Sequence, residues 1–302
     1  MELWIAITIV AALLQCVRTA LQQKLKALLT TNGANFVRYL YGAPLSLLAL
    51  ALIAANAGWS LPQASLYFVA FCALGGIAQI VATSLLIYAF TLRNFAVGTA
   101  YSKTETVQAA LFATLLLAEP LSLWAWIGIA ISLFGVWVLS MRGAGKGLAM
   151  VLTGWTQKSA LVGIASGTGF AIAAVSIRVA SLSLPSGDFV VRAIMTLAVM
   201  NSLQTVMMAS YLSWRERGTI GRVVATWRSS AVVGVLSVTG SACWALAMTL
   251  ENAAHVRAVG QIELIFTFIA SRYLLHERPS WGEILGALLV VAGVVTILLR
   301  GA

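Results

Sequence analysis

Long apolar stretches separated by short polar breaks run through the whole of this chain. A helix needs about 20 consecutive apolar residues to cross the hydrocarbon core of a bilayer. Ten segments of roughly that length can be marked between the breaks. They cover residues 3–22, 34–55, 64–90, 95–117, 121–141, 159–180, 188–211, 229–249, 254–275 and 280–300. The pattern predicts an all-α integral membrane protein with ten transmembrane helices.

The composition supports lipid, and not water, as the main solvent. Of the 302 residues, 61% are hydrophobic and only 9% are charged, whereas a soluble domain carries about 25% charged residues. The net charge of +10 does not indicate a nucleic-acid partner, because no polar domain is present to carry it; basic cytoplasmic loops explain it. Cys16, Cys72 and Cys243 are isolated in apolar segments, so neither a disulfide nor a metal is expected. No cofactor is expected either.

The second half of the chain repeats the first. A shift of 158 positions superimposes three pairs of identical charged residues, namely Glu105 with Glu263, Glu119 with Glu277 and Arg142 with Arg300. Such matches are informative because charge is scarce here. Earlier in each half a shift of 154 pairs Arg38 with Arg192, which predicts a short insertion in the second half. The predicted domains are a five-helix repeat over 1–143, a linker over 144–157 and a second five-helix repeat over 158–302.

Each predicted half contains an odd number of spans, so the second half enters the membrane from the opposite side. The two halves are therefore predicted to be inverted repeats, related by a pseudo-two-fold axis in the membrane plane. This arrangement suits alternating access, because exchanging the conformations of the halves closes one side and opens the other.

The end of each half carries a recognisable motif. The first copy is Leu-Ala-Glu-Pro-Leu-Ser at 117–122, followed by Gly128 and Gly135; the second is Leu-His-Glu-Arg-Pro-Ser at 275–280, followed by Gly286 and Gly293. On these residues the chain resembles the drug/metabolite transporter superfamily, of the EamA-repeat type. The resemblance implies a transporter of metabolites such as amino acids, drugs or nucleotide sugars, but it names no substrate. Lys103 together with Glu105 is not a general feature of that family.

Four ionisable residues stand inside the predicted spans: Lys103, Glu105, Glu263 and Arg18. A charge at the bilayer centre costs about 2.5–3.5 kcal/mol on insertion scales, so these side chains are expected to face a partner, a cavity or water. Lys103 and Glu105 are about 200° apart around a continuous helix, so no local ion pair between them is expected. Five further charged or titratable residues near span ends are expected to act as headgroup anchors: Arg38, Arg192, His255, Arg257 and Arg272.

Polar residues at helical spacing extend this set into a predicted substrate site. Its members are Glu105, Lys103, Glu263, Arg18, Tyr101, Gln108, Gln15, Gln79 and Gln261. The two glutamates are candidate sites for a proton or a cationic substrate. Arg18 or Lys103 would hold a substrate anion or a paired carboxylate. The alternative is a buried ion pair, such as Arg18 with Glu105, that only stabilises helix packing.

The sequence thus predicts a secondary active transporter of a small polar or amphipathic metabolite, proton-coupled or exchanging, in the cell inner membrane. A facilitative uniporter, a channel-like pore and a membrane-embedded enzyme are the alternatives; an enzyme is not expected, because no phosphate loop or metal-binding motif occurs. Efflux, import and exchange stay open. The expected partners are the substrate, protons as a candidate coupling ion, and membrane lipids, with the chain a monomer or homodimer. The count of Lys and Arg places both termini outside, whereas the resemblance implies cytoplasmic termini.

Overall fold

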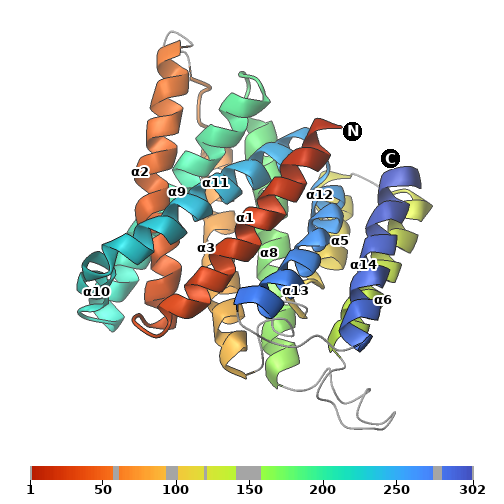
Figure 1. Cartoon of the computed structure of the whole chain (residues 1–302). Helices are drawn as coiled ribbons and strands as arrows, with labels where there is room; N and C mark the ends of the chain where they lie inside the picture. Colours follow the sequence, from red (N-terminus) through yellow and green to blue (C-terminus); the bar gives the residue numbers. More distant parts are fainter. Residues whose placement is uncertain are drawn as a thin grey trace. The chain divides into compact units, whose positions relative to one another are not determined.

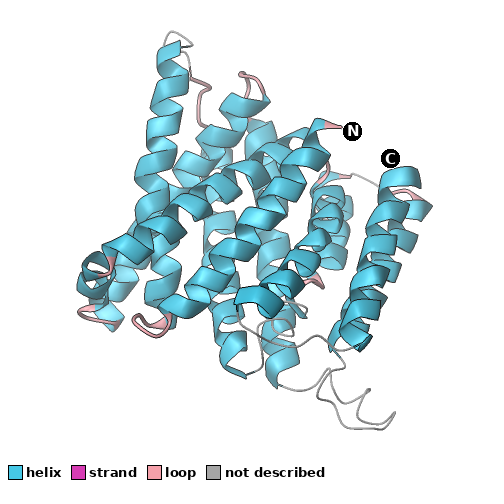
Figure 2. Ribbon diagram, viewed as in Figure 1, coloured by secondary structure: helices cyan, strands magenta, loops and turns pink. Residues whose placement is uncertain are grey.

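The computed structural model describes residues 2–56, 61–92, 101–118, 121–140, 158–274 and 281–300, and within these ranges the chain is helical without any strand (Figures 1 and 2). The predicted all-α class is confirmed. The elements of the first half are α1 Leu3–Leu25, α2 Thr31–Asn56, α3 Leu66–Leu92, α5 Glu105–Leu117 and α6 Leu123–Ser140. Those of the second half are α8 Lys158–Ser183, α9 Phe189–Arg215, α10 Thr219–Ala225, α11 Trp227–Leu250, α12 Ala253–Val259, η2 Gly260–Ile262, α13 Glu263–Leu274 and α14 Trp281–Arg300.

Among the described residues, six helices are long and apolar enough to cross a membrane: α1, α2, α3, α8, α9 and α11. Their outward positions carry large apolar side chains, as lipid contact requires; Leu48 and Leu52 on α2 are 55% and 58% exposed. The chain is therefore a multi-pass membrane protein. Shorter apolar helices cover Glu105–Leu117 and Leu123–Gly135, and the total of ten spans stays a prediction.

The chain forms two compact units that differ from the predicted halves. Unit 1 consists of Met1–Ile80 and Ile172–Asn252, and unit 2 consists of Val81–Ala171 and Ala253–Ala302. Each unit thus takes one segment from each half, and helices α3 and α8 each contribute residues to both units. The predicted division near residues 143 and 158 describes the sequence repeat, and it stays a prediction.

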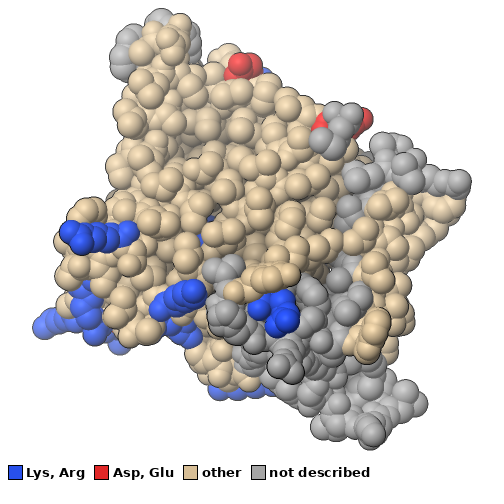
Figure 3. Space-filling view, viewed as in Figure 1, with Lys and Arg blue, Asp and Glu red and all other residues tan. Residues whose placement is uncertain are grey.

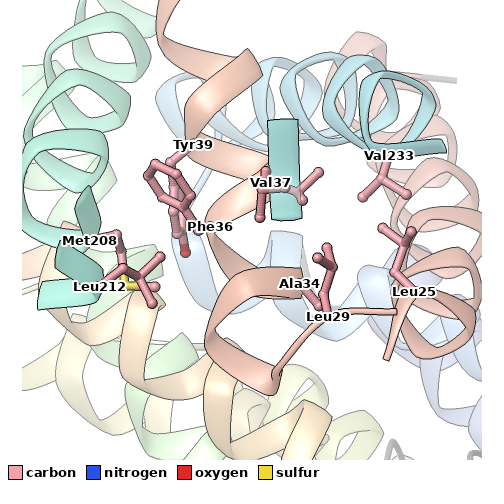
Figure 4. Packing of buried hydrophobic residues seen from close by; sticks show 10 residues of the cluster. Leu25, Leu29, Ala34, Phe36, Val37, Tyr39, Met208, Leu212 and Val233 are labelled. Carbon is pink, nitrogen blue, oxygen red and sulfur yellow. The ribbon is translucent and has the colours of Figure 1, made fainter. Parts of the chain in front are cut away.

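Unit 1 is organised around α2, which packs against α9 and α11, while α1 packs along α11. Figure 4 shows the apolar cluster where α2 meets its neighbours. The cluster comprises Leu25, Leu29, Ala34, Phe36, Val37, Tyr39, Met208, Leu212, Val223 and Val233. It draws on α1, α2, α9, α10 and α11, so a single core joins helices from both halves of the sequence.

Buried amides supplement this packing with hydrogen bonds between helices. Gln22 Nε2 donates to the carbonyl of Ala34 at 2.9 Å. Gln204 Nε2 on α9 donates to the carbonyl of Gly76 at 3.1 Å and to Gln79 Oε1 at 2.9 Å. Within hydrocarbon a helix gains nothing from hiding apolar surface, so close contact and such polar links hold the bundle together.

Unit 2 pairs the last helix of each half, α6 with α14, and packs α5 against α12. The motif glycine Gly293 allows α14 to lie directly against α6. A Cβ at this position would overlap the Ser132 side chain and come within 2.5 Å of the Gly128 carbonyl oxygen. Gly293 therefore serves close contact between the backbones of α14 and α6. Glu119 and Glu277 themselves lie outside the described residues.

A matched pair of glycine substitutions tests the packing of unit 1. At Gly234 on α11, an added Cβ would lie 2.7 Å from Tyr41 Cγ on α2, so Gly234→Ala should destabilise the protein by about 1–3 kcal/mol. At Gly221 on α10 an added Cβ meets nothing within 4 Å, so Gly221→Ala should be neutral or stabilise by up to about 1 kcal/mol. Thermal unfolding in detergent compares the two; equal midpoints would contradict the α2–α11 contact.

Candidate functional site

Two helix breaks in unit 2 place the acidic residues of the repeat. In the first half a turn at 103–104 precedes α5, which begins at Glu105. In the second half the 3₁₀ segment η2 separates α12 from α13, which begins at Glu263. The predicted continuous helices over 95–117 and 254–275 are therefore wrong at these points. Both glutamates begin a helix, where the helix dipole favours a negative charge.

The breaks bring four charged side chains together. Lys103 Nζ lies 2.5 Å from Glu263 Oε2 and 3.6 Å from Glu105 Oε1. Arg257 Nη1 lies 3.5 Å from the same oxygen of Glu105. All four side chains are at most 4% exposed. We call this set the charge quartet; it contains two cations and two carboxylates and is balanced in formal charge.

The contact between Lys103 and Glu105 corrects the sequence prediction. The prediction assumed a continuous helix, in which residues two apart point away from each other. Here the backbone bonds are of the i→i−3 kind, from Thr104 N to Tyr101 O at 3.4 Å and from Thr106 N to Lys103 O at 3.3 Å. The tighter, irregular turn changes the angle between the two side chains and allows both to reach one region.

Arg257 is a member of the quartet whose surroundings the sequence prediction misjudged. It was expected to anchor a span end at the headgroups, but only 3% of it is exposed, and it pairs with Glu105. The duplication contained the signal, because at the offset of 158 Arg257 matches the uncharged Thr99, and Lys103 matches the uncharged Gln261. Each half therefore adds one cation that its counterpart lacks.

Two ion pairs of the quartet join the two halves of the sequence, whereas the contact of Lys103 with Glu105 lies within the first half. Lys103 of the first half pairs with Glu263 of the second, and Arg257 of the second half pairs with Glu105 of the first. Gln261 continues the pattern, since its Nε2 donates to Thr106 Oγ1 at 3.0 Å. The equivalence predicted for Glu105 and Glu263 thus takes the form of two crossed pairs within unit 2.

Two glycines of α8 allow the helix to lie against the break at 103–104. A Cβ at Gly167 would be 2.7 Å from the Ser102 carbonyl oxygen and 3.1 Å from Glu105 N, and a Cβ at Gly163 would overlap Tyr101. The spacing Gly-x-x-x-Gly in an apolar helix typically marks a close helix contact. This signal was present in the sequence, and it identifies the surface that supports the quartet.

The remaining predicted site residues divide between the units. Tyr101 and Gln108 are half-buried beside the break, with Gln108 Nε2 3.4 Å from Thr104 Oγ1. In unit 1, Gln15 Oε1 accepts a 2.9 Å bond from Trp244 Nε1, and the buried Arg18 donates to Thr19 Oγ1 at 3.2 Å. The third member in unit 1 is Gln79, which accepts from Gln204. For all nine predicted site residues, those of the quartet included, a role in substrate binding stays a prediction.

Comparison with known proteins identifies the family of this chain. The EamA-like transporter family matches twice, over residues 2–141 and 157–299. The chain belongs to that family. A crystal structure of another protein superimposes with a TM-score of 0.67 over 99% of this chain and 97% of its own, at 16% sequence identity. At that identity the likeness shows a shared fold alone. As a member of the EamA-like transporter family, the chain is of the drug/metabolite type.

The energetics of the quartet can be tested without knowledge of a substrate. Lys103→Met would leave the Glu263 carboxylate buried without its lysine, and removing one partner of a buried pair costs about 3–5 kcal/mol. The double variant Lys103→Met with Glu263→Met removes both charges and should recover most of that loss. Thermal unfolding of the single and double variants in detergent measures the difference. A single variant as stable as the double would show that the pair carries no such coupling.

Proposed function

We propose that this EamA-like protein is a secondary active transporter that moves a small polar or amphipathic metabolite by alternating access. The observation that carries the proposal is the charge quartet, which is buried, balanced and built from both halves at two helix breaks. Discontinuous helices with charged residues at the break are the usual sites of substrate and coupling ions in transporters with inverted repeats. Ten spans in two inverted five-helix repeats complete the proposal.

The ion pairs between the two halves are compatible with a protein that changes conformation with its substrate bound. A buried ion pair gains little net stability, because desolvation offsets most of the attraction between the charges. A charged group of a substrate can therefore replace one partner at modest cost. The formal charges of the quartet sum to zero. The net charge of the site with substrate bound therefore stays zero when the substrate is a zwitterion, or when an ionic substrate moves together with a proton that neutralises it.

Proton coupling is assigned to Lys103 and Glu263. Arginine keeps its proton under all physiological conditions, whereas a lysine in a buried site can exchange one. The pair of Arg257 with Glu105 is therefore the permanently charged part of the quartet. The pair of Lys103 with Glu263 is the part that we propose for the coupled proton.

Neutralisation of Glu263 tests the transport mechanism. Proteoliposomes holding the purified chain are loaded with members of a metabolite panel, and saturable counterflow identifies a substrate. Glu263→Gln should then abolish accumulation driven by a pH gradient, with a loss of at least about tenfold, because the variant cannot carry the coupled proton. Glu2→Gln, at an exposed acidic residue of unit 1, is the matched control and should transport as the wild type does.

The outcomes separate the alternatives. Gradient-driven accumulation that survives in Glu263→Gln with unchanged pH dependence contradicts the proton assignment. Counterflow without any gradient-driven accumulation in the wild type indicates a facilitative uniporter. Flux that does not saturate indicates a pore, and an absence of flux for every metabolite contradicts the carrier itself.

The charges of unit 1 suggest its orientation in the cell inner membrane. Six cations stand at the end of α1 or around α10, namely Lys24, Lys26, Arg215, Arg217, Arg222 and Arg228. Glu2, Asp188 and Glu251 stand at the other ends of α1, α9 and α11. Because cytoplasmic loops are enriched in Lys and Arg, we assign the α10 end to the cytoplasm and residue 2 to the opposite side.

Single cysteines test this orientation. Arg217→Cys and Ser186→Cys introduce thiols at exposed positions before α10 and before α9, in a background with Cys16, Cys72 and Cys243 replaced by serine. In intact cells a membrane-impermeant maleimide should label position 186 and leave position 217 unlabelled. The reverse pattern would place the α10 end outside and agree instead with cytoplasmic termini.

A further inference from the structure

The connection between α9 and α11 differs strongly from its counterpart in the first half. Residues 214–228 contain four arginines and one glutamate, whereas residues 57–65, between α2 and α3, contain no charged residue at all. The second half also contains the insertion implied by the change of offset from 154 to 158. The basic charge of this connection is therefore a feature of the second half that the first half does not share.

The segment presents two exposed Trp-Arg dipeptides, one on each side of α10. Trp214 is 69% exposed and Trp227 is 58% exposed. The Arg215 guanidinium lies 4.1 Å from the Trp214 ring centroid, and that of Arg228 lies 5.6 Å from the Trp227 ring. Tryptophan prefers the level of the lipid headgroups, so each dipeptide puts its arginine at the level of the phosphates.

Helix α10 is held firmly and has an outer face. Val223 is fully buried in the apolar cluster of unit 1, with Ile220 packed against it, whereas Arg222 and Val224 are exposed. The outer face of α10 therefore presents one cationic and one apolar side chain at the surface of unit 1. Figure 3 shows Lys and Arg side chains gathered at the α10 end of unit 1.

The acidic residue of the segment is engaged by a neighbouring turn. Both carboxylate oxygens of Glu216 accept hydrogen bonds of 2.6 Å, one from Thr30 Oγ1 and one from Asn32 Nδ2. These bonds tie the α1–α2 turn, which contains Lys26, and the start of α2 to the end of α9, where Glu216 is the C-cap residue. The Glu216 carboxylate therefore accepts hydrogen bonds from Thr30 and Asn32, and the four arginines of the segment form a basic surface beside it.

We propose that this surface, formed by Arg215, Arg217, Arg222 and Arg228 with the two tryptophans, binds the headgroups of anionic phospholipids. Polybasic segments beside membrane helices gain affinity with each Lys or Arg near an anionic leaflet. The arginines contact phosphates, and the tryptophan rings lie at the boundary between headgroups and acyl chains. The proposal concerns unit 1 alone and does not depend on transport.

Native mass spectrometry of the purified full chain tests the proposal. The protein is incubated in detergent with equal amounts of phosphatidylglycerol and phosphatidylcholine, and the ratio of the retained lipids is measured. The wild type should prefer phosphatidylglycerol, and the preference should fall as salt is added. Replacement of the four arginines by glutamine should lower the preference by about fivefold for each arginine, with Trp214 and Trp227 unchanged.

Two matched variants and a second ligand control the result. Replacement of the same four arginines by lysine keeps the charge and should keep most of the preference; Arg192→Gln, at the start of α9 on the opposite end of unit 1, should keep all of it. The proposal is overturned if the wild type retains both lipids equally at low and high salt, or if the four-glutamine variant keeps the preference. Thermal stabilisation by inorganic phosphate equal to that by phosphatidylglycerol would also overturn it, because the ligand would then be a soluble anion.

Discussion

The cost of placing a charge in hydrocarbon governs this structure. The chain has nine acidic residues, and two of them, Glu105 and Glu263, are buried with Lys103 and Arg257. A single buried charge at membrane depth opposes insertion of its helix. Four charges that balance one another remove much of that penalty, but only when helices from both halves have come together. The quartet therefore makes the assembly of unit 2 depend on both halves of the sequence.

The helix breaks allow the four buried charges of the quartet to lie close enough to balance one another. In a continuous helix Lys103 and Glu105 would face different neighbours. Each break instead begins a new helix at a glutamate, where the helix dipole favours the negative charge of the carboxylate. The glycines of α8 then allow a neighbouring backbone to support the break at close range. The charged side chains, the helix breaks and the glycines of α8 thus all contribute to the position of the quartet.

Much of the fold could be predicted from the sequence, because lipid restricts a chain to a few structures. Apolar length predicted helices, and scarce charged matches predicted that Glu105 and Glu263 are equivalent. The compact units could not be predicted in this way, because a repeat describes ancestry and not which helices pack together. Arg257 was misjudged for a physical reason: its distance from a span end depends on where α12 begins, and hydropathy places such boundaries only to within a few residues.

The differences between the halves are as informative as their likeness. Arg257 has the uncharged Thr99 as its counterpart, and Lys103 has the uncharged Gln261, so the two cations stand at different positions of the repeat and cannot form two identical pairs. Crossing the pairs between halves restores the balance while leaving one lysine and one arginine, which differ in how readily they release a proton. A strictly symmetric site would respond identically from both sides of the membrane. Divergence between the repeats thus gives unit 2 two chemically different ion pairs, one built on a lysine and one on an arginine.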